Sequence, residues 1–415
     1  MKSILYQSRM KSIFMLSLLL LLGLSTYAQT TFPGTITHDG LQRRYLAFIP
    51  SGYNPAQAHE LVFVLHGGGG NAQRMFMMTR FDQVADTANF ILVFPQGVFS
   101  GLDGSGNPEY HWADGRQTTV PDTMGVDDVG FISALIDTFS ANYNIDADRI
   151  YAAGVSNGGY MSQRLACGLS DRLAAVATVA ATFPDSVVQE CNNATPLSIL
   201  IMNGTADALV PTYTGGMASG TGGWVLSTQQ MIAIWLSNNS CTNAFSAFNF
   251  PNISTSDNSW VRKFTYSTCS TVTELQHYKI FGGGHAWPGQ LFTGPNTGNV
   301  NEDISANEEI WNFFKDQSRV LLSTTSTSNI EAQSSVSIYP NPFQQSLTVE
   351  SAKNEQLQSI EILDLWGRTH WMADELSQSG AFSIADLQAL PKGYYLVKIR
   401  TDKGIFMQQV VKSLP

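Results

Sequence analysis

The sequence predicts an α/β fold with a mostly parallel sheet, followed by a small all-β domain. Short apolar runs alternate with helical patterns as far as Phe314, and residues 336–415 contain strand patterns alone. This alternation is typical of parallel sheets that helices cover on both faces. Ligands of such sheets bind at the carboxyl ends of the strands, so the loops there are the first places to search for a functional site.

The expected strands of the larger unit end in loops rich in glycine or polar residues. They lie in the stretches 60–70, 90–97, 149–166, 173–182, 196–207 and 275–285, and the stretch 149–166 continues through a turn into a helix. Residues 127–145 have apolar positions at helical spacing behind an N-capping Asp. These patterns predict strands and helices in alternation.

Four segments follow from these patterns. Residues 1–28 are expected to form a signal peptide, and residues 29–316 the α/β domain. The Ser/Thr-rich residues 317–335 are expected to be a linker, and residues 336–415 a β-sandwich.

The charge balance excludes nucleic acid as a partner. The formal net charge is −10, and Lys and Arg form no run. Phosphate binding needs a concentrated basic face, which this composition does not provide. Hydrophobic residues make up 43% of the chain, which is enough for a sizeable core.

The N-terminus predicts export. Lys2, Arg9 and Lys11 precede an apolar run at 14–25, and the small residue Ala28 follows at a suitable cleavage point. A membrane anchor is the alternative, but the apolar run is too short to span a bilayer. We therefore expect a secreted protein without a membrane span in its mature form, whether translation starts at Met1 or Met10.

The four cysteines agree with an oxidising compartment. Cys167, Cys191, Cys241 and Cys269 allow three disulfide pairings, and free buried thiols are the alternative. No C-x-x-C motif occurs, so the sequence does not support a zinc site or dithiol redox chemistry.

Ser156 is the candidate nucleophile. It lies in a G-x-S-x-G pattern, with Gly154 and Gly158 on either side, between a strand-like and a helix-like stretch. Small flanking residues let the chain turn sharply there and expose the hydroxyl. A backbone N–H of Gly68, or of its neighbour Gly69, is expected to complete an oxyanion hole with the N–H of Asn157.

The acid and the base are expected after later strands. Asp207 follows the strand in 196–207, with Asp171 and Asp185 as competitors, and His285 follows the strand in 275–285. The other histidines are less suitable by position: His38, His59, His66, His111, His277 and His370. The order Ser156, Asp207, His285 is that of α/β-hydrolases.

Two tryptophans are candidates for binding substrate. Trp112 lies in a long loop after an early strand, and Trp287 follows the candidate base by two residues. Either ring could stack on a sugar, a phenolic acid or a polyester segment, and core packing is the alternative.

Taken together, these motifs resemble those of polyhydroxybutyrate depolymerase-like esterases, a group that overlaps the feruloyl and acetyl-xylan esterases of carbohydrate esterase family 1. The motifs are VLHGGGGNAQ, FPQG, VDDVGFISALID, DRIYAAGVSNGGYMSQRLAC, NGTADALVP and GGGHAWPG, within residues 32–316. The resemblance implies an α/β-hydrolase fold and no metal or organic cofactor. It also implies Ser156 as nucleophile, Asp207 as acid, His285 as base, and sequential cysteine pairing. The glycine run at 67–70 departs from many relatives.

The C-terminal unit resembles the type A sorting domain of the type IX secretion system. YPNP at 339–342, LDLWGR at 363–368, LPKGYYLVKI at 390–399 and the ending VVKSL match that pattern. The resemblance implies that the secretion machinery is a partner. A small carbohydrate-binding module is the alternative, which the absence of an obvious aromatic platform disfavours.

The function expected from these features is hydrolysis of polymer-linked esters outside the cell. Feruloyl or acetyl esters of plant polysaccharide are the first choice, and polyhydroxyalkanoate is the second. A peptidase and a non-catalytic surface binding protein on a hydrolase scaffold are the remaining alternatives.

Overall fold

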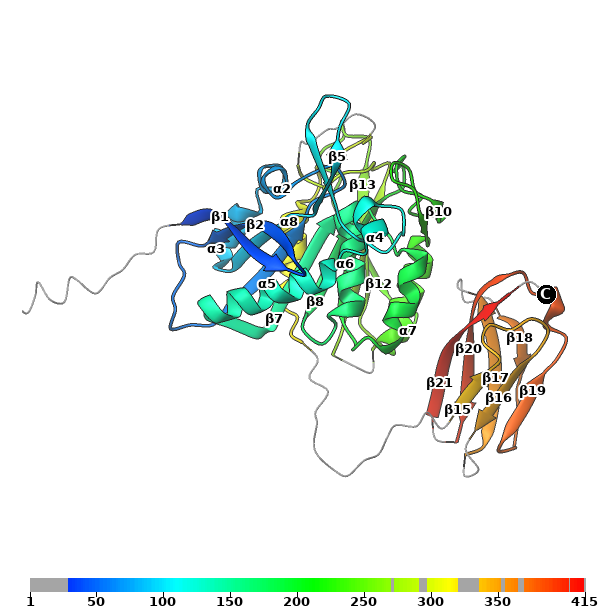
Figure 1. Cartoon of the computed structure of the whole chain (residues 1–415). Coiled ribbons are helices and arrows are strands. Elements are labelled where there is room, and N and C mark those ends of the chain that lie inside the picture. The colour runs from blue at the N-terminus through cyan, green and yellow to red at the C-terminus, as the bar shows by residue number, and fades with distance from the viewer. Residues whose placement is uncertain are drawn as a thin grey trace, which may run out of the picture.

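The computed structural model describes residues 29–269, 272–290, 297–319, 336–351, 355–364, 369–402 and 404–413. The expected signal peptide and residues 320–335 of the expected linker lie outside this range. The described chain contains an α/β unit and a smaller all-β unit (Figure 1). No helix within these residues is long and apolar enough to cross a membrane.

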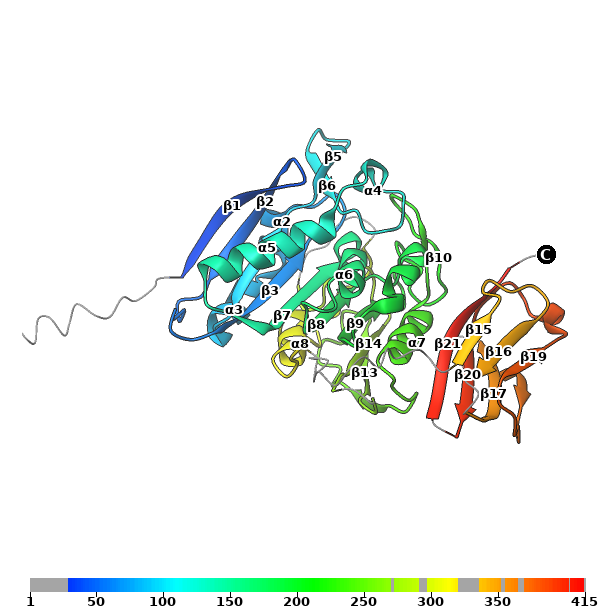
Figure 2. The ribbon, with the colours of Figure 1, turned by 60° about the horizontal axis from the view of Figure 1, so that its bottom comes forward.

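A ten-stranded sheet forms the centre of the α/β unit (Figure 2). Its strands, in sheet order, are β1 (Thr30–His38), β2 (Leu41–Ile49), β4 (Ile91–Pro95), β3 (His59–Leu65), β7 (Ile145–Val155), β8 (Ala175–Val179), β9 (Ser198–Gly204), β14 (Leu275–Phe281), β13 (Trp260–Tyr266) and β12 (Ser246–Asn249). The strands from β4 to β14 run parallel. Those at both edges pair antiparallel. The mostly parallel sheet is confirmed, with antiparallel edges that the sequence patterns did not predict.

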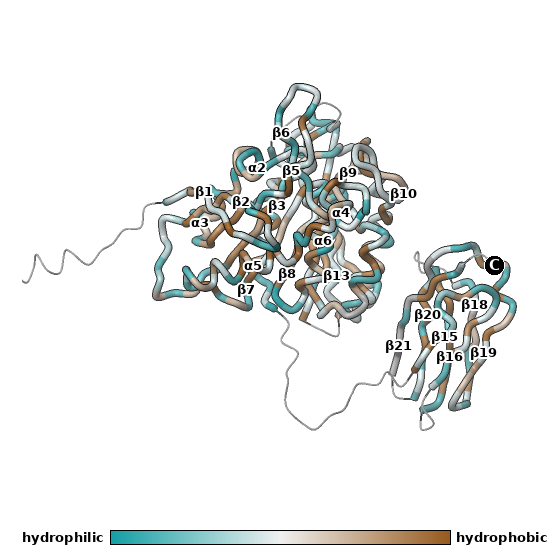
Figure 3. The backbone as a smooth tube through the Cα atoms, in the orientation of Figure 1, coloured by the Kyte–Doolittle hydropathy of each residue, from teal (hydrophilic) through white to brown (hydrophobic). Residues whose placement is uncertain are grey.

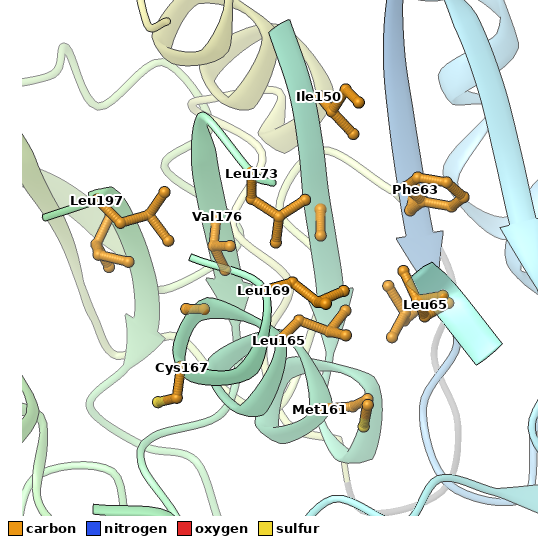
Figure 4. Close-up of a cluster of buried hydrophobic side chains, with 14 of the residues drawn as sticks. Phe63, Leu65, Ile150, Met161, Leu165, Cys167, Leu169, Leu173, Val176 and Leu197 are labelled. Carbon is orange, nitrogen blue, oxygen red and sulfur yellow. The ribbon is translucent and has the colours of Figure 1, made fainter. Parts of the chain in front are cut away.

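Helices cover both faces of the sheet. One face packs against α5 (Asp128–Asn142), α6 (Asn157–Gly168) and α7 (Thr228–Asn238), and the other against α2 (Ala72–Thr79), α3 (Phe81–Ala88) and α8 (Ala306–Phe314). Successive residues of β3 alternate between the two cores, with Phe63 in the first and Val64 in the second. Figure 4 shows Leu65 of β3 near Leu165 of α6. Burying each such side chain stabilises the fold by about 1.5–3 kcal/mol.

Shorter elements form the loops at the carboxyl edge of the sheet and nearby. They are β5 (Val98–Leu102), β6 (Pro108–His111), α4 (Val120–Met124), the 3-10 helix η2 (Asp185–Asn193), β10 (Gly216–Met217) and β11 (Trp224–Val225). In β5–β6 and β10–β11, two antiparallel strands form a hairpin.

Two disulfides close short loops of the α/β unit. Cys167 pairs with Cys191, and Cys241 pairs with Cys269, across 24 and 28 positions of sequence. This is the sequential pairing that the family resemblance implied. Loops of this size contribute about 3–4 kcal/mol each in the chain-entropy account of disulfide stabilisation.

The C-terminal unit consists of two antiparallel sheets around one core. The first contains β15 (Val336–Tyr339), β16 (Leu347–Ser351) and β19 (Ala381–Ile384). The second contains β18 (Thr369–Ala373), β17 (Leu357–Asp364), β20 (Gly393–Thr401) and β21 (Gly404–Lys412). A short 3-10 helix, η3 (Leu387–Ala389), precedes β20. Inward-facing residues of both sheets, such as Val349 and Ile360, share a buried cluster. Figure 3 shows brown, hydrophobic stretches along these strands and along the central strands of the α/β unit.

Candidate active site

The three candidate catalytic residues follow three strands of the parallel part of the sheet. Ser156 follows β7, Asp207 follows β9 and His285 follows β14. The strand order places β7, β8, β9 and β14 side by side. Because parallel strands end at the same edge, all three residues lie at the carboxyl edge of the sheet.

Ser156 occupies a strained turn. Its backbone has φ 55° and ψ −122°, between the last residue of β7 and the first residue of α6. A non-glycine residue in this region costs about 1–3 kcal/mol and persists only where its surroundings impose it. The Ser156 N–H donates to the Val179 carbonyl at 3.0 Å, and the Ser156 carbonyl accepts the Tyr160 N–H at 2.9 Å. Both sides of the turn are therefore anchored.

The glycines around Ser156 are required by close backbone approach. A Cβ on Gly154 would lie 2.1 Å from the Gly158 carbonyl oxygen. A Cβ on Gly158 would lie 2.5 Å from the carbonyl oxygens of Leu65 and His66. The turn thus packs directly against the end of β3, which carries the glycine run.

His285 and Asp207 form a hydrogen-bonded pair. His285 Nδ1 lies 2.9 Å from Asp207 Oδ2, and the Asp207 side chain is fully excluded from solvent. The other carboxylate oxygen, Oδ1, accepts the N–H groups of Leu209 and Val210, each at 2.9 Å. The carboxylate is therefore fixed by three hydrogen bonds, and the partner of His285 is Asp207 rather than Asp171 or Asp185.

The remaining contact of a triad would join His285 to Ser156. Among the described residues, no hydrogen bond links the Ser156 hydroxyl to His285. Because Nδ1 donates to Asp207, the neutral ring leaves Nε2 as its acceptor. Such hydroxyl–imidazole contacts are often long in ligand-free sites and tighten only when substrate binds.

The glycine run lies against the Ser156 turn. A Cβ on Gly67 would lie 3.4 Å from Ser156 Cβ, and one on Gly68 would lie 3.6 Å from Asn157 Cβ. The Gly69 N–H is already used, since it donates to the Tyr110 carbonyl at 3.0 Å. Of the two glycines considered for the oxyanion hole, Gly68 therefore remains the better candidate. The Asn157 N–H, at the first position of α6, has no acceptor within its own helix.

His66 supports the glycine run from behind. Its Nδ1 donates to the Gly67 carbonyl at 2.8 Å, and its Nε2 accepts the Gly97 N–H at 3.0 Å. Burial lowers the pKa of His66 to about 4, so the ring is neutral near pH 7. A neutral ring can donate and accept at once, as these two bonds require.

A buried polar network behind Asn157 escaped the sequence analysis. Asn157 Nδ2 lies 2.5 Å from Asp114 Oδ2, and Arg116 Nε donates to the same oxygen at 2.9 Å. Burial raises the pKa of Asp114, and the Arg116 charge opposes that rise. A weak signal was available: in a chain with only 13% charged residues, an Asp and an Arg two positions apart follow a predicted loop tryptophan.

The two tryptophans expected to bind substrate are core residues, which corrects that expectation. Trp112 is fully buried, and its Nε1 donates to the His66 carbonyl at 2.9 Å. Trp287 is 3% exposed, and its Nε1 donates to Asn307 Oδ1 at 2.9 Å. Neither ring has a free face for a ligand, because apolar and polar neighbours already surround it.

An exposed tryptophan lies elsewhere near the acid loop. Trp224 is 62% exposed and pairs across the β10–β11 hairpin with Met217. The Ser219 N–H of the same hairpin donates to the Leu209 carbonyl at 2.8 Å, and the Leu209 N–H bonds Asp207. The hairpin is thus attached to the loop that carries the acid.

Hydrogen bonds link two sets of side chains near the site. Asp207 is bonded to His285, whereas Asp114 is bonded to Arg116 and Asn157. Within the described ranges, no group of three or more His, Cys, Asp or Glu is placed to hold a metal ion.

Comparisons with known proteins found similar esterases. The feruloyl esterase B of Piromyces equi is 28% identical over 250 residues, which are 59% of this chain and 42% of that protein. The feruloyl esterase C of Emericella nidulans is 28% identical over 178 residues, which are 41% of this chain and 56% of that protein. The chain therefore spans about half the length of these relatives. A solved acetyl xylan esterase from Aspergillus awamori aligns with 68% of this chain and 99% of its own, at 11% identity and a TM-score of 0.44.

Two family models match separate parts of the chain. The model described as phospholipase/carboxylesterase matches residues 47–233, which include the Ser156 turn and Asp207. The model described as secretion system C-terminal sorting domain matches residues 337–413. The chain therefore contains a region that matches the phospholipase/carboxylesterase family, followed by a region that matches secretion system C-terminal sorting domains.

Proposed function

We propose that this protein is a secreted serine esterase that cleaves polymer-linked carboxylic esters. The observation that carries the proposal is the His285–Asp207 hydrogen bond at the sheet edge where Ser156 occupies its strained turn. A base fixed by a buried acid, at the same sheet edge as a hydroxyl on a sharp turn, is an arrangement suited to acyl transfer.

The proposed reaction has two acyl-transfer steps. His285 Nε2 takes the proton of the Ser156 hydroxyl, and Oγ bonds to the ester carbonyl carbon. The N–H groups of Gly68 and Asn157 stabilise the resulting oxyanion. The bond to the alcohol then breaks, and the alcohol leaves with the proton from His285.

Water completes the cycle. His285 takes a proton from a water molecule, and the water oxygen attacks the acyl-enzyme carbonyl carbon. The ester bond to Ser156 then breaks, Oγ regains a proton from His285, and the carboxylic acid is released. Asp207 orients the imidazole and stabilises its charged form in both steps.

Feruloyl or acetyl esters of plant polysaccharide are the proposed substrates. The names of the relatives support this choice, because two are feruloyl esterases and a third is a bifunctional acetylxylan esterase/xylanase from Neocallimastix patriciarum. A secreted enzyme also meets substrates that are too large to import. Polyhydroxyalkanoate remains the second candidate.

The sorting domain supports a secreted or cell-surface location. Its match covers almost all of the C-terminal unit, which is the part expected to engage the type IX secretion machinery. The sorting-domain match favours this interpretation over a carbohydrate-binding module.

The experiment that tests the proposal compares the wild-type protein with Ser156→Ala. We expect the wild type to hydrolyse p-nitrophenyl acetate and to release product from feruloylated arabinoxylan or acetyl-xylan. Ser156→Ala should keep its circular dichroism spectrum and lose turnover. Hydrolysis of polyhydroxybutyrate alone would support the second candidate. Absence of turnover together with absence of fluorophosphonate labelling at Ser156 would support a binding protein instead.

A further inference from the structure

Asp114 is a buried carboxylate that the proposed reaction does not use. Its side chain is fully excluded from solvent, in the loop between β6 and α4. Burying a charged carboxylate without partners would cost much free energy, so the groups that pair with Asp114 are needed to keep it there. Those partners are the Arg116 guanidinium and the Asn157 side-chain amide.

Asn157 connects this carboxylate to the Ser156 turn. It directly follows Ser156 as the first residue of α6, and it is 2% exposed. Its Oδ1 accepts the Trp112 N–H at 2.9 Å, while its Nδ2 donates to Asp114 Oδ2 at 2.5 Å. The loop at 112–114 thus holds both ends of the amide. Because the side chain and the backbone of Asn157 share one Cα, this also restrains the direction of its backbone N–H.

Arg116 fixes the position of Asp114 from the other side. Its Nε donates to Asp114 Oδ2 at 2.9 Å, and its backbone N–H donates to Asp114 Oδ1 at 3.0 Å. The guanidinium also donates to the Gly222 carbonyl at 2.8 Å and to Thr221 Oγ1 at 2.9 Å. Two loops therefore hold Asp114 in place, and Asp114 in turn restrains the Asn157 side chain.

We propose that Asp114 is a positioning residue of the oxyanion hole, which holds the Asn157 backbone N–H toward the developing oxyanion by clamping the Asn157 side chain. The inference rests on the proposed function, since the oxyanion forms only in ester cleavage. Oxyanion donors act in the transition state, so their displacement lowers kcat and leaves KM unchanged. Because Asp114 acts through Asn157, removing the Asn157 side chain also removes the restraint that Asp114 provides.

The test is a double-mutant cycle in the full chain with p-nitrophenyl acetate. Asp114→Ala and Asn157→Ala should each lower kcat about 10–100-fold with KM within about twofold, less than the loss of a whole donor. The double variant should resemble Asn157→Ala alone, since the two changes act through one contact. Asp114→Asn, which keeps an acceptor oxygen for Asn157 Nδ2, should recover part of the loss.

Gln163→Ala is the matched control. Gln163 is a fully buried polar residue of the same helix, bonded to Thr178 and Trp235 rather than to the loop at 112–114. Gln163→Ala should lower the thermal stability of the protein. At assay temperatures below unfolding, its kcat should equal that of the wild type.

Two results would overturn the inference. One is a folded Asp114→Ala protein with kcat within twofold of wild type, and the other is losses that multiply in the double variant. If Asp114→Ala does not fold, Asp114→Asn and its combination with Asn157→Ala give the same comparison. Failure of the proposed function is a separate result, because it would appear as an inactive wild type or an active Ser156→Ala protein.

Discussion

His285 Nδ1 lies 2.9 Å from Asp207 Oδ2, and the second oxygen of that carboxylate accepts two backbone N–H groups. The acid is therefore held in place by its own loop, and the imidazole is held by the acid. This geometry fixes the ring tautomer that leaves Nε2 as a base, as general-base catalysis by histidine requires.

Replacing the acid by an amide should lower turnover with little structural change. In Asp207→Asn the side chain keeps its size, but it no longer stabilises the charged imidazole and favours the wrong tautomer. We expect kcat for p-nitrophenyl acetate to fall about 10³–10⁴-fold. Asp185→Asn, which alters a competing acid that is not the partner of His285, is the control and should retain activity. Full turnover by Asp207→Asn would contradict the proposed pair.

The turn around Ser156 should not accept a methyl group at its flanking glycine. In Gly154→Ala the new Cβ would lie 2.1 Å from the Gly158 carbonyl oxygen, so the turn must shift. We expect a loss of about 1–3 kcal/mol in the free energy of unfolding, together with lost activity. Gly104→Ala is the matched control, because nothing lies within 4 Å of its Cβ position. Denaturant titration measures the free energy of unfolding of both variants. Equal values for Gly154→Ala and Gly104→Ala would show that the turn has room for a methyl group.

The strands that carry the site could be predicted from sequence because their signal is local. β3, β7, β9 and β14 are short apolar runs that end in glycine or polar residues, and these runs predicted both the sheet and the loops with Ser156, Asp207 and His285. The edge strands were missed because they lack that signal. All four residues of β12 are exposed, and β1 alternates between exposed and half-buried positions.

The environment of individual side chains was less predictable, since it depends on distant partners. Trp287 is buried and donates to Asn307, 20 positions away. Trp112 is buried and donates to His66, 46 positions away. The contact between Asp114 and Asn157 spans 43 positions. A loop tryptophan therefore looks the same in sequence whether it faces a ligand or the core.

Stability should fall as the pH decreases below about 6.5. Burial lowers the pKa of His66 to about 4 and that of His277 to about 3 in the folded protein. Between these values and the ordinary value near 6.5 the unfolded chain binds the additional protons, so the free energy of unfolding decreases toward acid. Each histidine contributes a slope of about 1.4 kcal/mol per pH unit in that window.

His277→Gln should reduce this acid dependence. His277 lies on β14, and its Nε2 is 3.2 Å from the Tyr213 hydroxyl. Glutamine keeps a polar group at this position but does not titrate. Unfolding measured from pH 4 to pH 8 should show a shallower slope in the variant, whereas His370→Gln in the C-terminal unit should leave the slope of the α/β unit unchanged. Identical slopes in all three proteins would refute the role of His277.

Trp224 should matter for polymeric substrates and not for small esters. Its indole is 62% exposed on the β10–β11 hairpin, which is bonded to the Asp207 loop through Ser219 and Leu209. An exposed indole on a hairpin that is bonded to the loop of the acid offers a face on which a sugar ring can stack. Trp224→Ala should therefore raise KM for acetyl-xylan or feruloylated arabinoxylan about 2–10-fold, as expected for the loss of about 0.5–1.5 kcal/mol of stacking. Turnover of p-nitrophenyl acetate should stay the same.

Phe248→Ala on the edge strand β12 is the control, because it removes a ring with a similar exposure of 55%. It should leave the hydrolysis of both substrates unchanged. An equal loss on the polymer and on the small ester would show that Trp224 supports the site rather than the polysaccharide chain.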